Sequence, residues 1–374
     1  MRELKYQKAF DTLRSEILSG KYSATTSFPS VMGAGKRFGI SRLTAVKVFD
    51  KLKEAGLIRA RSGSGTFVTK QGASRKLGVI VPLHAYSEIF TKIVGVLSRL
   101  AQEAGYTLVF GDVSSTSHSA RERMAKSMAR RFVEEGVAGV IFMPIDFLSD
   151  AERVNREVLK IFDDAGIAVV LCDYDIVSPP KRSGYDVVGI NNVEAGAAMV
   201  EHLVSVGARR ISFLLHPNSP LSHRNRYRGA VIAEKDRPGL IVRKLVADPD
   251  DTKGILRHLK SFRPNAVICG NDALAVKFSR VLQKLKKAVP DDLLLAGFDG
   301  VQLGAMMIPP LTTICQPCDK MAEIVFHALV ARIGNPSLPP REVYLPFRLI
   351  ATESTVRPSG KNSQKTCSRL KGKE

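Results

Sequence analysis

The feature that most constrains this 374-residue chain is a regular alternation of apolar runs with amphipathic helical segments, which begins at residue 77. The apolar runs are nearly continuous, as in parallel strands that are buried on both faces, and the amphipathic segments provide the helices that cover such a sheet. Strands are expected at 77–82, 107–111, 139–143, 168–172, 187–190, 210–215, 266–269 and 293–297. Helices are expected at 88–104, 118–135, 151–165, 193–206, 225–235, 252–261, 272–287 and 319–333.

The alternating part of the chain, residues 77–356, is too long to fold around a single sheet. It therefore predicts an α/β body of two doubly wound, parallel-sheet subdomains with a ligand-binding cleft between them. A chain of this length and apolar content has enough material for two or three domains with sizeable cores.

The stretch Ser41–Gly56 predicts a short helix with Ser41 as its N-cap and Gly56 as its stop. Val46, Phe49 and Leu52 are expected on its apolar face, and the opposite face carries several lysines and arginines. Such a helix fits the DNA major groove, although an ordinary surface helix with solvated lysines has the same pattern.

The segments on either side of this helix favour the DNA-binding interpretation. Residues 57–61 and 66–69 predict two strands around a Ser-Gly-Ser-Gly turn, which together form a β-hairpin wing. Upstream, an amphipathic helix is expected at 6–20, and a second one begins at Phe28-Pro29-Ser30 and ends near Gly39. Residues 1–69 therefore predict a winged helix-turn-helix domain.

This domain also carries a specific set of short motifs. In chain order they are Tyr6, Leu13-Arg14, Ile17, Gly20-Lys21-Tyr22, Phe28-Pro29-Ser30, Phe38-Gly39-Ile40-Ser41-Arg42-Leu43-Thr44, Leu52, Gly56-Leu57-Ile58 and Gly63-Ser64-Gly65-Thr66-Phe67-Val68. The set resembles the GntR family of bacterial regulators over nearly the whole domain. The resemblance implies DNA contacts from Arg42 and Thr44 in the recognition helix and from Gly63 in the wing.

Other residues of the same surface extend or modify this expectation. Lys47 lies on the basic face of the predicted helix, and Arg61 and Ser64 lie on the wing, so we add all three to the predicted DNA contacts. At two positions where the family usually has a contacting arginine, this chain has Met32 and Val46. The operator is therefore expected to differ from the one common in the family.

The net charge of +20 is distributed unevenly. Residues 1–76 have 16 Lys and Arg against five Asp and Glu, whereas the long middle of the chain is nearly neutral. A basic head on a near-neutral body indicates a polyanionic partner such as double-stranded DNA. Residues 70–76 are expected to be a flexible basic linker, and residues 357–374 a basic disordered tail.

The body carries a second set of motifs. In chain order they are Leu77-Gly78-Val79-Ile80-Val81-Pro82, Gly189-Ile190-Asn191-Asn192, Ala195-Gly196, His202-Leu203, Gly207-Ala208-Arg209-Arg210-Ile211, Arg226-Tyr227-Arg228-Gly229, Gly270-Asn271-Asp272-Ala273-Leu274-Ala275, Gly297-Phe298-Asp299, Leu311-Thr312-Thr313-Ile314 and Gln316. The set is similar to the effector domain of lactose- and galactose-repressor proteins, which share the periplasmic sugar-receptor fold. A GntR-type head on such a body resembles the arabinose-repressor type of chimera.

The second resemblance implies a small-molecule effector site. The residues that the resemblance implies are Asp173, Arg226, Asn271, Asp299 and Gln316. The aromatic side chains of Tyr86 and Phe90 are candidates to cover an apolar sugar face. An arginine can bridge neighbouring hydroxyls, and carboxylates and amides pair with the others, so a monosaccharide is the expected ligand. A purine is the alternative effector, and turn capping after a strand is the alternative role of Asn271 and Asp299.

Other functional classes find little support in the sequence. It has no G-x-S-x-G, Walker or H-E-x-x-H motif, and its seven histidines are scattered, so a sugar-processing enzyme is disfavoured. Cys315 and Cys318 form a lone C-x-x-C without a second pair, so neither a metal nor a cofactor is expected. The chain starts without a signal-like or membrane-spanning segment, which favours a cytoplasmic protein over a transport receptor. We therefore predict a ligand-responsive transcriptional regulator, most simply a repressor, that acts as a homodimer.

Overall fold

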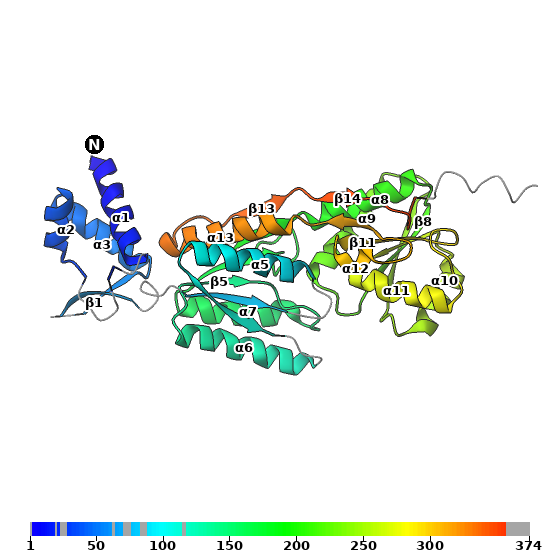
Figure 1. Cartoon of the computed structure of the whole chain (residues 1–374), viewed down its shortest axis with the longest axis horizontal. Coiled ribbons are helices and arrows are strands. Elements are labelled where there is room, and N and C mark those ends of the chain that lie inside the picture. Colours follow the sequence, from blue (N-terminus) through cyan, green and yellow to red (C-terminus); the bar gives the residue numbers. More distant parts are fainter. Residues whose placement is uncertain are drawn as a thin grey trace, which may run out of the picture. The chain divides into compact units, whose positions relative to one another are not determined.

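The computed structural model describes residues 2–18, 21–22, 28–61, 64–69, 76–82, 88–113 and 117–356 (Figure 1). The chain divides into two compact units: unit 1 comprises Met1–Ile190 and Cys318–Leu345, and unit 2 comprises Asn191–Pro317 and Pro346–Glu374. The predicted linker at 70–76, except Lys76, and the predicted tail at 357–374 lie outside the described residues. No helix among the described residues is long and apolar enough to cross a membrane.

The N-terminal domain has the predicted order of a winged helix-turn-helix. Its elements are α1 (Arg2–Leu18), α2 (Val31–Phe38), α3 (Arg42–Glu54), β1 (Ile58–Arg61) and β2 (Gly65–Val68). The two strands pair antiparallel as a hairpin. Apolar side chains from all three helices and from the hairpin form one small core, which includes Phe10, Phe28, Phe49, Leu52 and Val68.

The apolar face of α3 differs from the prediction. Its buried side chains are Ala45, Val48, Phe49 and Leu52. Val46, which we expected on this face, is 39% exposed. The reason is helical geometry: Ala45 starts an i, i+3, i+4, i+7 stripe, and the next residue points about 100° away from it.

The body of unit 1 is a parallel sheet covered by helices on both faces. Its strands are β3 (Lys76–Val81), β4 (Thr107–Asp112), β5 (Gly139–Phe142), β6 (Ala168–Asp173), β7 (Asp186–Ile190) and β13 (Glu342–Leu345), in the spatial order β13-β7-β6-β5-β3-β4. Its helices are α5 (Glu88–Glu103), α6 (His118–Glu134), α7 (Ala151–Asp164) and α13 (Cys318–Gly334). α5 packs with α13 on one face of the sheet, and α6 packs with α7 on the other (Figure 1).

Unit 2 repeats this arrangement. Its strands are β8 (Arg210–Leu215), β9 (Ile241–Val246), β10 (Ala266–Cys269), β11 (Leu294–Asp299), β12 (Thr312–Cys315) and β14 (Arg348–Ile350), in the order β14-β12-β11-β10-β8-β9. Only β14 runs antiparallel to its neighbour. Its helices are α8 (Asn192–Ser205), α9 (Leu221–Lys235), α10 (Thr252–Phe262), α11 (Asp272–Lys284) and α12 (Gln302–Ala305).

These sheets confirm the predicted fold class and extend it. Each predicted strand and helix of the body has a counterpart in the structure. The strands β9, β12, β13 and β14 were not predicted, and α9 begins four residues earlier than expected, at Leu221. In both sheets the chain reverses its direction of growth after two strands, between β3 and β5 and between β8 and β10. Such a switch point opens a crevice at the carboxyl ends of the strands, where ligands bind in folds of this kind.

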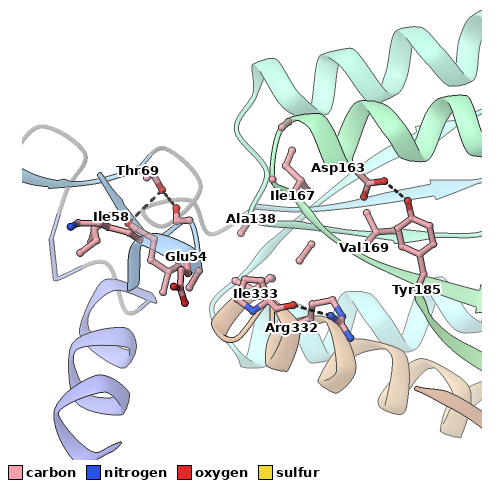
Figure 2. Close-up of a pocket in the computed structure, with 18 of the residues that line it drawn as sticks. Glu54, Ile58, Thr69, Ala138, Asp163, Ile167, Val169, Tyr185, Arg332 and Ile333 are labelled. Carbon is pink, nitrogen blue, oxygen red and sulfur yellow. Dashed lines mark hydrogen bonds between the residues drawn. The ribbon is translucent and has the colours of Figure 1, made fainter. Parts of the chain in front are cut away.

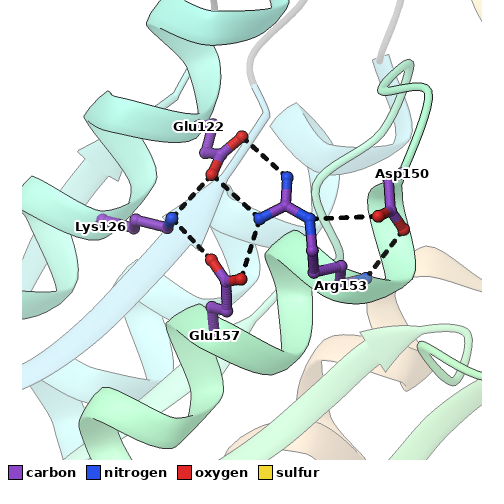
Figure 3. Close-up of polar contacts among 5 residues, drawn as sticks. All are labelled: Glu122, Lys126, Asp150, Arg153 and Glu157. Atoms are coloured by element: carbon purple, nitrogen blue, oxygen red, sulfur yellow. Dashed lines mark hydrogen bonds and ion pairs between the residues drawn. The ribbon is translucent and has the colours of Figure 1, made fainter.

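A charged network joins α6 and α7 on the surface of unit 1 (Figure 3). Arg153 contacts Glu122, Asp150 and Glu157, and Lys126 bridges Glu122 and Glu157. These cations lower the pKa of Glu122 to about 2. The network therefore fixes the two helices on one face of the sheet.

In unit 2, two glycines allow α8 and α9 to cross in close contact. A Cβ atom on Gly196 would overlap the carbonyl oxygen of Arg226, and one on Gly229 would overlap the carbonyl oxygen of Val193. The backbones of the two helices thus touch where a side chain would hold them apart. This contact sets the position of α9, and therefore of Arg226.

Gly196→Ala is expected to lower the free energy of unfolding by about 3 kcal/mol, because the new methyl group forces two packed backbones apart. Gly95→Ala in α5 is the control, because a Cβ there meets no atom within 4 Å. Alanine at this helical position is expected to stabilise the protein by up to ~1 kcal/mol. Urea unfolding followed by circular dichroism measures both effects, and equal effects would contradict the packing argument.

Candidate functional site

Four of the predicted effector residues come together in unit 2 at the carboxyl ends of its strands. Asn271 follows β10, Asp299 is the last residue of β11, and Gln316 follows β12. Arg226 lies in the second turn of α9 and extends to these strand ends. The structure thus assembles residues that are up to 90 positions apart in the sequence.

Arg226 is the centre of this cluster and is only 1% exposed. Its Nε donates to Asn192 Oδ1 at 2.8 Å, and its Nη1 donates to the Gly270 carbonyl at 2.8 Å. Its Nη2 donates to Asp299 Oδ1 at 3.1 Å. The guanidinium carbon also lies 4.8 Å from the centre of the Phe298 ring. These contacts fix the orientation of the guanidinium within unit 2 itself.

Asp299 accepts further hydrogen bonds, from Gln316 Nε2 at 2.9 Å and from the Asn271 side chain. Burial raises the pKa of Asp299, while Arg226 and these donors favour its charged form. The backbone of Asp299 is strained, with φ of +111°. Strain of this kind at a strand end, in a non-glycine residue, is typical of functional sites.

Two amides complete the unit 2 cluster. Asn271 also caps α11, because its Oδ1 accepts a hydrogen bond from the Leu274 amide at 2.9 Å. Asn271 therefore caps α11 and also lies beside Asp299. Gln316 Oε1 is buried and has no hydrogen-bond partner among the described residues. A buried acceptor of this kind is satisfied when a ligand donates to it.

Unit 1 carries a second polar cluster, at the carboxyl ends of β5 and β6. Asp173 ends β6 with a strained φ of +88°, as Asp299 ends β11 in unit 2. The Tyr174 hydroxyl donates to Asp146, and Arg121 Nη1 donates to the Asp146 and Phe147 carbonyls. Burial, followed by the nearby charge of Asp173, raises the pKa of Asp146 well above its usual range.

The structure describes one of the two aromatic candidates. Phe90 is buried in α5 of unit 1, at 4% exposure. Tyr86 lies outside the described residues. Unit 1 contains a cavity of about 590 Å³. Its lining includes Ile58 and Thr69 of the N-terminal domain and Ile167 and Val169 at the amino end of β6 (Figure 2). None of the predicted effector residues lines this cavity.

Sequence reasoning missed three residues of these clusters. Asn192 accepts from Arg226, and Asp146 accompanies Asp173. Asp272 is fully buried, accepts from the Thr313 hydroxyl and the Val301 amide, and so ties α11 to the end of β11. A signal was present for Asp146, because it follows a predicted strand closely, as Asp173 does. The Asn192 contact depends on the α8–α9 crossing and has no local signal.

On the head, the predicted DNA contacts of α3 lie at its amino-terminal end. Arg42 and Lys47 are exposed and have no carboxylate partner among the described residues. Thr44 is half-buried, and its hydroxyl shares a hydrogen bond of 2.9 Å with Ser41 Oγ. Ser41 in turn caps the helix by accepting from the Thr44 amide.

Two of the three predicted DNA contacts of the wing lie among the described residues. The Arg61 guanidinium lies 5.4 Å from the centre of the Phe67 ring, which holds it along the hairpin. Ser64 is exposed in the turn, and its amide donates to the Arg61 carbonyl. Gly63 lies outside the described residues.

Comparison with known proteins agrees with both parts of this geometry. Residues 5–68 match the family described as "Bacterial regulatory proteins, gntR family". Residues 200–355 match the "Periplasmic binding protein-like domain". The chain therefore joins a GntR-type DNA-binding domain to a periplasmic-binding-protein-like domain.

Several relatives of this regulator have the same organisation or the same body. The ribose operon repressor of Escherichia coli (strain K12) is 26% identical over 283 residues, which is 74% of this chain and 81% of the relative. The arabinose metabolism transcriptional repressor of Geobacillus stearothermophilus is 24% identical over 350 residues, 89% of this chain and 92% of the relative. A periplasmic binding protein/LacI transcriptional regulator from Alkaliphilus metalliredigens QYMF, solved with D-xylulofuranose, has a TM-score of 0.62 at 21% identity. That alignment covers 76% of this chain and 100% of the solved one and supports the fold.

In this regulator, Arg226→Ala is expected to lower the free energy of unfolding by about 3–5 kcal/mol, because it leaves Asp299 buried without its cation. Arg224→Ala is the matched control, since Arg224 is exposed on the same helix. A surface substitution of this kind is expected to change stability by no more than ~0.5 kcal/mol. Urea denaturation of both variants measures the difference, and a similar stability for the two would rule out a structural role of the pair.

Proposed function

We propose that this protein is a carbohydrate-responsive transcriptional repressor that binds a roughly palindromic operator as a homodimer. It acts in the cytoplasm, without metal or cofactor and without enzymatic turnover. The repressor names of the ribose and arabinose relatives support this function. The structural observation that carries it is the unit 2 cluster around Arg226, on a chain that also has a winged helix-turn-helix head.

The chemistry of the cluster suits a small polyol. Asp299 has acceptor capacity for a hydroxyl in addition to its contact with Arg226, and Gln316 Oε1 requires a donor. A sugar hydroxyl both donates and accepts, so one ring can satisfy both groups. We propose that Arg226, Asn271, Asp299 and Gln316 form the unit 2 part of the effector site.

Unit 1 contributes a corresponding set. Asp173 occupies in its sheet the place that Asp299 occupies in the sheet of unit 2, and both are buried and strained. Asp146 lies close enough to Asp173 for their charges to interact. We propose that Asp173 and Asp146 accept hydrogen bonds from the sugar, and that Phe90 and Tyr86 provide apolar surface.

DNA recognition is assigned to the head. Arg42, Thr44 and Lys47 of α3 face the major groove in this proposal, and Arg61, Gly63 and Ser64 of the wing contact the adjacent backbone or groove. The exposed cations favour phosphates and base edges alike. Residues 1–76 carry a net charge of +11, which attracts a polyanion.

Arg42→Ala is expected to weaken binding to a duplex selected from a random library by ~1–3 kcal/mol, the range for one good base contact. Arg257→Ala is the control, because it removes one exposed positive charge from α10 in unit 2. Fluorescence anisotropy at several salt concentrations measures both variants. If Arg42→Ala binds as tightly as the parent while its head stays folded, α3 is not part of the DNA interface.

Reciprocity between the two sites tests the regulatory function. A thermal-shift screen of monosaccharides, sugar phosphates and purines first identifies the ligand class, with purines as the alternative. If the ligand weakens operator binding by a given factor, the operator must weaken ligand binding by the same factor, with an expected coupling of ~1–3 kcal/mol. Calorimetric titration of the ligand with and without operator DNA measures this factor. Equal ligand affinities in the two titrations would show that the sites are uncoupled.

The matched variant for this titration is Gln316→Ala, because Gln316 contacts Asp299 but carries no charge. It is expected to lower ligand affinity roughly 2- to 10-fold, in line with the ~0.5–1.5 kcal/mol of a hydrogen bond between neutral groups. Operator binding without ligand is expected to be unchanged. An unchanged ligand affinity would remove Gln316 from the effector site.

A further inference from the structure

The recognition helix exposes apolar side chains where polar ones would normally read DNA. Leu43 in the first turn of α3 is 75% exposed, and Val46, one turn later, is 39% exposed. Residues three apart on a helix lie on the same face, so these two side chains are neighbours. Met32, in the first turn of α2, is 65% exposed.

These exposed side chains do not belong to the core of the head. The buried stripe of α3 is Ala45, Val48, Phe49 and Leu52, and neither Leu43 nor Val46 takes part in the apolar cluster that joins α1, α2, α3 and the hairpin. A leucine whose surface is three-quarters exposed gains little from burial in the folded monomer. Its apolar surface can be removed from water only when another molecule covers it.

The surroundings of Leu43 and Val46 identify the chemistry of that molecule. The exposed cations Arg42 and Lys47 stand directly beside them in the sequence of α3, and neither has a carboxylate partner among the described residues. An apolar pair next to two available cations complements a surface that is anionic but carries apolar groups. The major groove of DNA has this character, because phosphates flank it and the C5-methyl of thymine is its apolar group.

Base chemistry favours thymine as the direct target of these side chains. Guanine, cytosine and adenine present donors and acceptors but no methyl group in the major groove, and leucine and valine cannot pair with donors or acceptors. A thymine methyl group gains from apolar contact, and the amino-terminal residues of a recognition helix are those that reach base edges.

We propose that Leu43 and Val46 read thymine methyl groups in the operator. This proposal rests on the DNA-binding function proposed above and names the readout that α3 uses. It assigns to Leu43 and Val46 the specificity that hydrogen-bonding side chains provide in other recognition helices. The half-site is then expected to contain thymine at one or two fixed positions under the first two turns of α3.

The test uses the full-length protein and a duplex selected from a random library. Each thymine of the half-site is replaced singly by deoxyuridine, which lacks the C5-methyl but keeps the same hydrogen-bonding edge. At one or two positions this change is expected to weaken binding about fourfold. This factor corresponds to the ~0.8 kcal/mol gained by burying one methyl-sized group. Leu43→Ala or Val46→Ala is expected to abolish the difference between thymine and deoxyuridine at its own position.

Val206→Ala is the control variant, because Val206 is a comparably exposed valine at the end of α8 in unit 2, at 37%. It is expected to retain the full deoxyuridine effect. The proposal is overturned if no thymine is sensitive to deoxyuridine, or if the sensitivity persists unchanged in both Leu43→Ala and Val46→Ala. In those cases tight binding to the selected duplex would still support the DNA-binding function. A protein that selects no duplex at all would overturn that function and this proposal together.

Discussion

In unit 2, the buried guanidinium of Arg226 connects separate parts of the fold. Arg226 belongs to α9, yet its polar contacts reach Asn192 in α8, a carbonyl after β10 and the Asp299 carboxylate of β11. This reach depends on Gly196 and Gly229, because the backbones of α8 and α9 can touch only where neither helix has a side chain. In the proposed effector site, a ligand would therefore meet groups that are already oriented, and it would not have to supply the free energy to order them.

The same pairing restricts the kind of ligand that unit 2 favours. Arg226 and Asp299 carry opposite charges in direct contact, so the cluster has little net charge to offer an ion. In unit 1, Asp173 and Asp146 add acidic groups, and burial, followed by the nearby charge of Asp173, raises the pKa of Asp146. An anionic ligand such as a sugar phosphate would be repelled by these acidic groups. A neutral polyol, whose hydroxyls donate to carboxylates, avoids this repulsion.

The parts of the structure that the sequence predicted are those with strong local signals. Continuous apolar runs located the central strands, and caps such as Ser41 located the helices that follow them. The edge strands β9 and β13 were missed because their residues are partly exposed and lack a continuous apolar run. Val46 was assigned to the wrong face because Ala45 is small and its place in the buried stripe was overlooked. The Asn192 contact was missed because it exists only once two helices have packed together.

At the head, the residue types of α3 set the balance between affinity and specificity. Leu43 and Val46 carry no polar group, so the charged side chains that the start of α3 offers to DNA are Arg42 and Lys47. The Thr44 hydroxyl already shares one hydrogen bond with Ser41. The affinity that cations contribute depends on the salt concentration more than on the DNA sequence. A small number of cations can therefore discriminate only a small number of bases. In the proposed homodimer, the spacing of two half-sites adds to the selectivity that each head obtains from base contacts. If the ligand-sensing body changes that spacing, a head that reads few bases makes operator binding more dependent on the ligand.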